Sequence, residues 1–170
     1  MLTKTDIEKY FIAEKQVGLV FFVIGIVAVL LAIVFFFFLR TNFYKGAAIP
    51  LIVVGLLELI AGLTIYNKSD DDRIHNVYAF DMNPYELKEK ELPRMQKITK
   101  TFSIYKWVEV VLAVTGIVLI VLYRRTPERA FWFGLGITLT LQALITFSAD
   151  YLAEKRAQIY RDQLEAFVKK

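Results

Sequence analysis

Four long runs of apolar residues alternate with polar segments along the chain. The runs are Val17–Leu39, Gly46–Tyr66, Trp107–Tyr123 and Ala130–Ala149, and they contain 23, 21, 17 and 20 residues. An α-helix needs roughly 17–25 apolar residues to cross the hydrocarbon of a bilayer. The pattern therefore predicts an all-α, multi-pass membrane protein, with transmembrane helices at about 17–39, 46–66, 104–125 and 130–150.

The polar segments differ greatly in length. Only "RTNFYK" and "RRTPER" join the first to the second run and the third to the fourth, whereas about forty polar residues separate the two pairs. Short connections favour antiparallel neighbours. We expect a four-helix bundle of two hairpins in a single domain, residues 1–170, with a loop at 67–103 and a helical tail at 151–170.

Several helices are expected to continue beyond the membrane. "TDIE" at 5–8 is typical of a capping box before the first run. Pro93 suits the first turn of a helix that would extend to Arg125. "NPYELKEKEL" indicates a short helix capped by Asn83 and Glu86. The apolar stripe of the tail predicts packing against the other extensions or against a partner.

Lysine and arginine are distributed unevenly between the two ends of this bundle. Fifteen belong to the N-terminal flank, the 67–103 loop and the tail, and five belong to the two short turns. Under the positive-inside rule both termini and the loop are cytoplasmic. We expect the protein in a bacterial inner membrane, with the lipid bilayer as its surroundings.

The two hairpins resemble each other weakly. "KQVGLVFFVIGIV" at 15–27 aligns without a gap with "KWVEVVLAVTGIV" at 106–118, and Glu58 then corresponds to Gln142. Apolar segments also align by chance. If a duplication exists, it predicts parallel repeats related by an axis along the membrane normal.

One acid, Glu58, lies near the centre of the second run. A charge there costs on the order of 2.5–3.5 kcal/mol on insertion scales, so such residues face the interior. Gly55 and Gly62 share its helical face, which favours close helix packing. Gly25 and Gly116 mark similar faces on the first and third helices.

The interior predicted from these faces contains the polar residues Glu58, Gln142, Glu109 and Thr138. Glu58 could be an ion or proton site, a structural hydrogen-bond donor to Gln142, or part of an interface with a second subunit. Glu109 could instead pair with Lys106, three residues earlier, near the headgroups.

Composition excludes several classes of function. The chain has no cysteine, which rules out disulfides and thiol chemistry, and its net charge is only +4. No phosphate loop, dinucleotide fingerprint or protease motif is present. Asp71 and His75 alone make a weak metal pair. We therefore expect no enzyme, cofactor, metal or nucleic acid.

The runs "FYKGAAIPLIVVGLLELIAG" and "DMNPYELKEKELPRM" resemble small four-helix membrane proteins of Bacteroidota-type bacteria. That group has no established activity, so the resemblance implies the fold and assigns no site residue. Some small bacterial multi-helix proteins of similar build protect their host from a membrane-acting toxin, which makes an immunity role a candidate by analogy.

The leading hypothesis is non-enzymatic association with another membrane component or with a second copy, in an accessory or immunity-type role. Its expected surface comprises Tyr85, Leu87, Ile159 and Leu164. The alternative is a small oligomeric channel or transporter that uses Glu58.

Overall fold

The computed structural model describes residues 2–169 and is all-α, with no strand in that range. The elements are α1 (Lys4–Ile33) with a π-helical end η1 (Val34–Leu39), α2 (Asn42–Met82), the short α3 (Pro84–Glu86), a π-helical turn η2 (Leu87–Glu91), α4 (Leu92–Tyr123), a 3-10 turn η3 (Pro127–Arg129) and α5 (Ala130–Val168).

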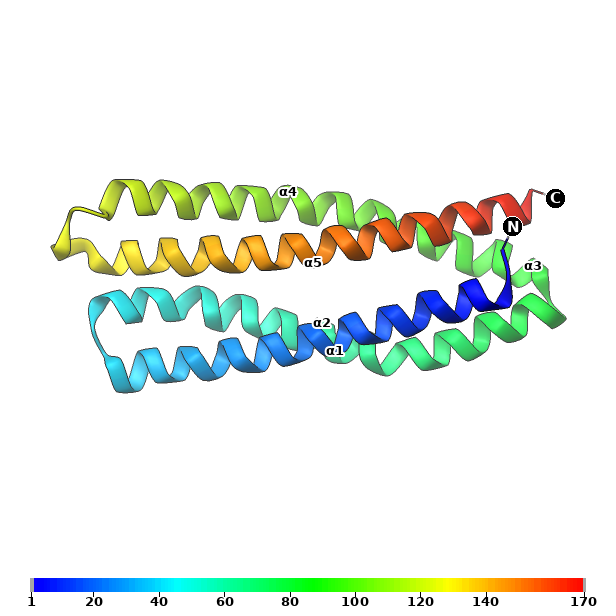
Figure 1. Ribbon diagram of the computed structural model, residues 1–170, viewed down its shortest axis with the longest axis horizontal. Helices are drawn as coiled ribbons and strands as arrows, with labels where there is room; N and C mark the ends of the chain where they lie inside the picture. Colours follow the sequence, from blue (N-terminus) through cyan, green and yellow to red (C-terminus); the bar gives the residue numbers. More distant parts are fainter. Residues whose placement is uncertain (1, 170) are drawn as a thin grey trace.

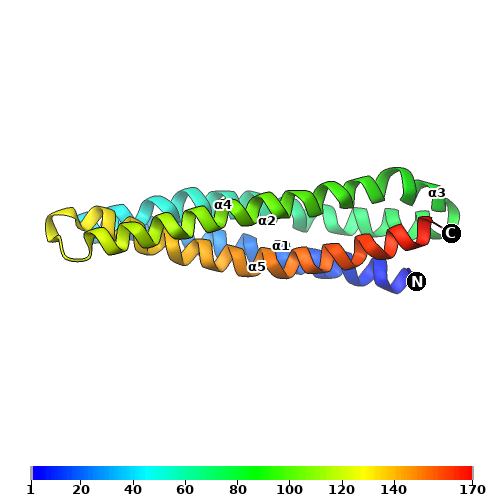
Figure 2. The same ribbon diagram turned by 90° about the horizontal axis from the view of Figure 1, so that it is seen from above.

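Two antiparallel hairpins, α1–α2 and α4–α5, lie side by side along the long axis of the molecule (Figures 1 and 2). The two tight turns lie at one end, and the termini and α3 lie at the other. The hairpins therefore point in the same direction, as parallel repeats would. The duplication itself stays a prediction.

Four helical segments of the described chain are long and apolar enough to cross a membrane. Each of these segments, 36 to 42 residues long, contains one of the four apolar runs of the sequence. Many of their large apolar side chains, including Leu30, Ile60, Val111 and Leu122, are exposed. Apolar side chains that face outward all along a helix are typical of a membrane span.

The segment expected to be a loop is mostly helix. α2 continues through residues 67–82, which contain neither glycine nor proline, and only 83–91 separate it from α4. Ser69 and Asn76 donate hydrogen bonds to the carbonyl oxygens of Ile65 and Asp72, one helical turn back. The polar composition of this segment thus reflects a solvated helix rather than a break.

Two predicted caps are also corrected. The capping box of α1 is formed by Thr3 and Asp6, two residues earlier than expected. Asn83 makes no side-chain capping bond, and Glu86 pairs with Lys90 at 2.5 Å. Pro93 does lie in the first turn of its helix.

A hydrophobic core joins all four long helices at the end that carries the termini. Its buried residues are Leu2, Ile7, Phe11, Ala79, Leu87, Met95, Ala157, Tyr160 and Leu164. The apolar stripe of the tail therefore packs against the other helical extensions. Leu87 and Leu164 are fully buried here, which corrects their assignment to a partner-binding surface, whereas Tyr85 and Ile159 are exposed.

Glycines let the helices of each hairpin approach closely. A Cβ atom added to Gly25 would lie 2.6 Å from the carbonyl oxygen of Gly55, and one on Gly116 would lie 2.8 Å from that of Gly136. Gly62 meets the backbone of Gly18 in the same way. A side chain at these positions would force the helix backbones apart.

The hairpins also touch each other at the end with the tight turns. Gly46 of α2 abuts the carbonyl oxygen of Phe131 in α5, and Gly134 abuts that of Phe43. The two hairpins are thus held at both ends, by these backbone contacts and by the hydrophobic core. Between the ends they leave an internal space.

Candidate functional site

A cavity of about 600 Å³ occupies the space between the hairpins. All four long helices contribute to its wall. Most of the wall is apolar and includes Val17, Phe21, Val54, Ala61, Ile65 and Leu112. A concave, mainly apolar space with a few polar groups is the usual form of a ligand site.

Each long helix places one carboxyl group in this cavity. The four acids among the lining residues are Glu14 from α1, Glu58 from α2, Glu109 from α4 and Asp150 from α5. Arg156 is the one basic side chain among the same lining residues. The wall therefore combines an apolar surface with an excess of acidic groups.

Glu58 and Glu109 are the most deeply buried of these acids, with 6% and 8% of their surface exposed. The Oε2 atom of each is buried and has no hydrogen-bond partner in the structure. Buried polar groups are almost always satisfied, so two orphaned carboxyl oxygens in one cavity call for an explanation.

Lys106 does not neutralise Glu109, contrary to the expectation from their spacing. Its Nζ atom lies 2.6 Å from Oε2 of Glu154 on α5. A tertiary partner on the facing helix therefore replaces the local one, and Glu109 instead lies beside Asp150 and Thr146 of α5.

Gln142 and Thr138 do not join the acids. Neither polar atom of the buried Gln142 amide has a hydrogen-bond partner, so the expected bond between Glu58 and Gln142 is not formed. Thr138 donates to the carbonyl oxygen of Gly134 at 3.1 Å. Both residues lie outside the cavity wall.

Sequence reasoning missed Glu14 and Asp150. Both flank an apolar run, where charged residues are common, so nothing in the sequence marked either acid as a candidate site residue. The packing of α5 against α4 places Asp150 beside Glu109. The arrangement of one acid per helix emerges only when the hairpins are packed together.

Glu14 lies where the cavity meets the hydrophobic core at the termini. The hydroxyl group of Tyr10 donates to its Oε1 atom at 3.5 Å. Burial raises the pKa of Glu14 to about 7, against an opposing effect of the nearby Arg94. Arg94 is held by Glu91 at 2.7 Å and by Asp72 at 3.5 Å. Glu14 can therefore gain or lose a proton near neutral pH.

The cavity opens sideways. Leu57 of α2 and Tyr105 and Val108 of α4 all line it, yet 63%, 52% and 51% of their surfaces are exposed. The contact between the hairpins is made mainly by α2 and α5, while α2 and α4 scarcely pack against each other. The opening therefore lies between α2 and α4.

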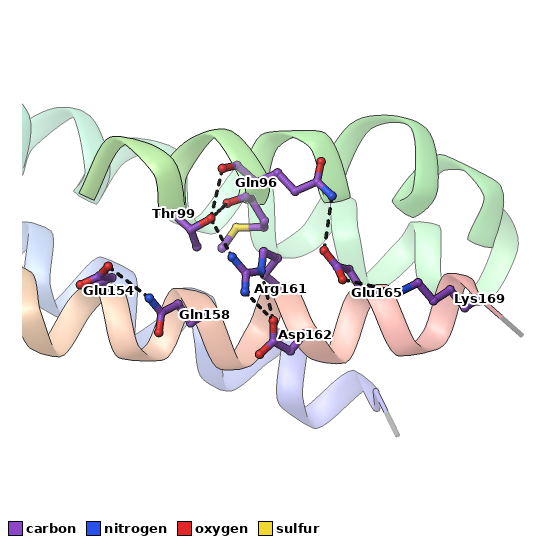
Figure 3. Close-up of polar contacts among 9 residues, drawn as sticks. Gln96, Thr99, Glu154, Gln158, Arg161, Asp162, Glu165 and Lys169 are labelled. Atoms are coloured by element: carbon purple, nitrogen blue, oxygen red, sulfur yellow. Dashed lines mark hydrogen bonds and ion pairs between the residues drawn. The ribbon is translucent and has the colours of Figure 1, made fainter. Parts of the chain in front are cut away.

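A second, polar groove of about 400 Å³ runs between α4 and α5 (Figure 3). Several of its side chains form hydrogen bonds with one another. Arg161 donates to the Thr99 hydroxyl at 3.3 Å, Gln96 to Glu165 at 3.4 Å, and Gln158 to Glu154. This groove is a structural seam between the two helices.

His75 also has a partner, because its Nε2 atom lies 3.4 Å from a carboxylate oxygen of Glu86 in α3. Within residues 2–169 no three His, Cys, Asp or Glu side chains are placed to hold a metal ion together. The Asp71–His75 spacing therefore does not lead to a metal cluster in the described chain.

Comparison with known proteins gives no match: no family model, curated protein or solved structure is significantly similar to this chain. The resemblance to small Bacteroidota-type membrane proteins therefore stays a prediction from the sequence.

Proposed function

We propose that the chain is a non-enzymatic, multi-pass membrane protein that binds a cation in the cavity between its hairpins and carries it as a small transporter. One observation carries this proposal. Glu58 and Glu109, from different hairpins, reach the same cavity, and each has a buried carboxyl oxygen without a partner.

The energetics favour a ligand role over a structural one. A buried carboxyl group that only fixes helix packing is expected to have a hydrogen-bond partner, because an unsatisfied polar group costs about 1–3 kcal/mol. The partner expected from the sequence, Gln142, does not fill that role. A buried acid tends to be neutral, and an incoming cation stabilises its charged form. Cation binding and proton release would then be linked.

The membrane setting of this proposal rests on the four long apolar helices and on their exposed apolar side chains. In this setting the two hairpins form a four-helix bundle with both termini and residues 83–91 in the cytoplasm of a bacterial cell. The excess of lysine and arginine at that end supports this orientation.

The orientation can be tested with single cysteines because the chain has none of its own. Lys88 and Glu128 are exposed at opposite ends of the molecule. Lys88→Cys should react with a membrane-impermeant maleimide only after cells are opened, and Glu128→Cys should react in intact cells. The reverse labelling would overturn the orientation, and labelling of both in intact cells would exclude membrane crossing.

Transport can be tested in vesicles that contain the purified protein and a pH-sensitive dye inside. We expect a cation gradient to drive proton movement in the wild type and not in Glu58→Gln. Glu128→Gln is the matched control, since it makes the same change at an exposed turn. Equal proton movement in the wild type and in a folded Glu58→Gln protein would disprove the proposal.

Protein–protein association is the second candidate function, and an exposed stripe supports it. Ile74, Tyr78 and Met82 follow one another at four-residue intervals on α2, and Tyr85 follows in α3. More than 60% of each side chain is exposed. This stripe replaces the surface that Leu87 and Leu164 were expected to provide. It suits an accessory or immunity-type partner, or a second copy.

Association can be measured by the oligomeric state in mild detergent and by capture of neighbouring membrane proteins from native membranes. Alanine at the four stripe positions should abolish a complex that the wild type forms. Alanine at the exposed Tyr151 and Leu152 on α5 is the control. A complex that survives the stripe substitutions would rule out this surface.

A further inference from the structure

The cavity also indicates which cation it accepts. We infer that the ligand is a lipophilic organic cation that reaches the cavity from the bilayer through the opening between α2 and α4. This inference rests on the proposed function and adds the class of substrate and its route.

The size of the cavity favours an organic molecule. At about 600 Å³ it lies within the range of roughly 300–1,000 Å³ that holds drug-sized ligands. A small inorganic cation needs several oxygen ligands at close range, about six to eight for Ca²⁺. The described residues contain no such ligand cluster, although four acids share the cavity. Asp150 lies beside Glu109, but among the described residues the acids do not form a group of three or more placed to hold a metal ion.

The wall suits a cation with an apolar body. Apolar side chains such as Phe21, Val54 and Leu112 make up most of it, and they gain from contact with a hydrocarbon or aromatic surface. Phe102 and Tyr105 add aromatic rings that can interact with a diffuse positive charge. A strongly hydrated ion would gain nothing from this surface.

The acidic side chains of the cavity complement the positive charge of the ligand. Glu58 and Glu109 line the cavity from opposite hairpins, and each has one buried carboxyl oxygen without a hydrogen-bond partner, so a monocation between the hairpins lies near both residues. Lys106 is already paired with Glu154 and does not compete for them. Because the cavity wall has more acidic than basic side chains, it should attract a cation and exclude an anion of the same shape.

The opening gives the route. Leu57 and Val108, which flank it, lie within the segments predicted to be in the hydrocarbon layer. A molecule that partitions into the bilayer can therefore enter the cavity without passing through water. A hydrophilic cation has no such access along this side.

The test uses tetraphenylphosphonium as the probe and the full-length protein in lipid nanodiscs. We expect saturable binding by equilibrium dialysis, at least tenfold weaker in Glu58→Gln/Glu109→Gln and unchanged in Glu128→Gln. Tetraphenylborate has the same shape and the opposite charge, and it should not compete. An excess of Na⁺, K⁺ or Ca²⁺ should not displace the probe.

A second variant guards against misfolding of the double mutant. Ala61→Phe narrows the cavity, keeps all four acids, and should also weaken binding of the probe. Circular dichroism and size-exclusion profiles identify variants that have lost the fold. Equal binding by the wild type, a folded double mutant and Ala61→Phe would reflect partitioning into lipid and would overturn the inference.

The two proposals fail in different ways. Absence of saturable probe binding, combined with Glu58-dependent proton movement driven by an inorganic cation, would overturn the ligand class and leave the transport proposal standing. Absence of both would overturn the transport proposal as well.

Discussion

The Nζ atom of Lys106 lies 2.6 Å from a carboxylate oxygen of Glu154 and thereby ties α4 to α5. Glu154 is almost completely buried in this pair. The same lysine is three residues from Glu109, within reach of it on the helix surface. The ion pair with Glu154 therefore keeps a positive charge away from the acid-lined cavity.

Removal of this pair should weaken cation binding. In Glu154→Gln the Lys106 ammonium group loses its partner and becomes free to approach Glu109. We expect binding of tetraphenylphosphonium in nanodiscs to fall at least severalfold. Lys106→Gln in the same background should restore it, because the competing charge is gone. Unchanged binding in Glu154→Gln would show that Lys106 does not affect the cavity.

Substitution of Gly25 should destabilise the first hairpin. Alanine places a Cβ atom 2.6 Å from backbone atoms of Gly55 and Leu59, which are rigid parts of α2. Overpacking of this kind costs about 1–3 kcal/mol. The free energy of unfolding can be measured by denaturant titration of the detergent-solubilised protein. Val27→Ala, at an outward-facing position of the same helix, should cost much less. Equal free energies of unfolding for Gly25→Ala and Val27→Ala would argue against the close approach of α1 and α2 at Gly25.

Glu14 should make stability depend on pH. Its pKa is raised by burial from 4.5 to about 7, so between these values the folded protein binds more protons than the unfolded chain. Stability therefore falls as pH rises from about 4.5 to 7 and levels off above 7.

This dependence can be isolated by comparison with Glu14→Gln, which keeps a polar partner for Tyr10. The difference in unfolding midpoint between the two proteins should shift in favour of the variant as pH rises through that window. A difference that is constant from pH 4.5 to 8 would contradict the environment described for Glu14.

Alanine should destabilise the protein at one position of the helical tail and have little effect at another. Leu164 is fully buried in the core at the termini, so Leu164→Ala should cost about 2–5 kcal/mol of the free energy of unfolding. Ile159 is exposed, and Ile159→Ala should change stability by no more than about 0.5 kcal/mol. Similar costs at both positions would mean that the tail packs through a different face.

The sequence alone predicts the helices well, because four uncharged or nearly uncharged runs have few alternatives to a membrane helix. It was less informative on residues 67–82. Their polar composition suggested a loop, yet the absence of glycine and proline was the better guide, since these two residues are the strongest breaks in a helical pattern.

The candidate site was predictable only in part. Glu58 and Glu109 stand out because acids are rare within apolar runs. Glu14 and Asp150 border such runs and look ordinary, and only the packing of the hairpins brings them to the same cavity. Lys106 illustrates the limit of local spacing, because a partner on another helix replaced the neighbour three residues away.

The continuity of α2 has a mechanical consequence. Glu58 and the exposed stripe at Ile74, Tyr78 and Met82 belong to one uninterrupted helix. From Glu58 to Met82 it extends roughly 36 Å at 1.5 Å per residue. A partner that tilts or rotates the far end of this rod must also displace the carboxyl group in the cavity. The helix thus connects the end of the molecule that carries the termini to the cavity, and a partner bound at the stripe would change the position of Glu58.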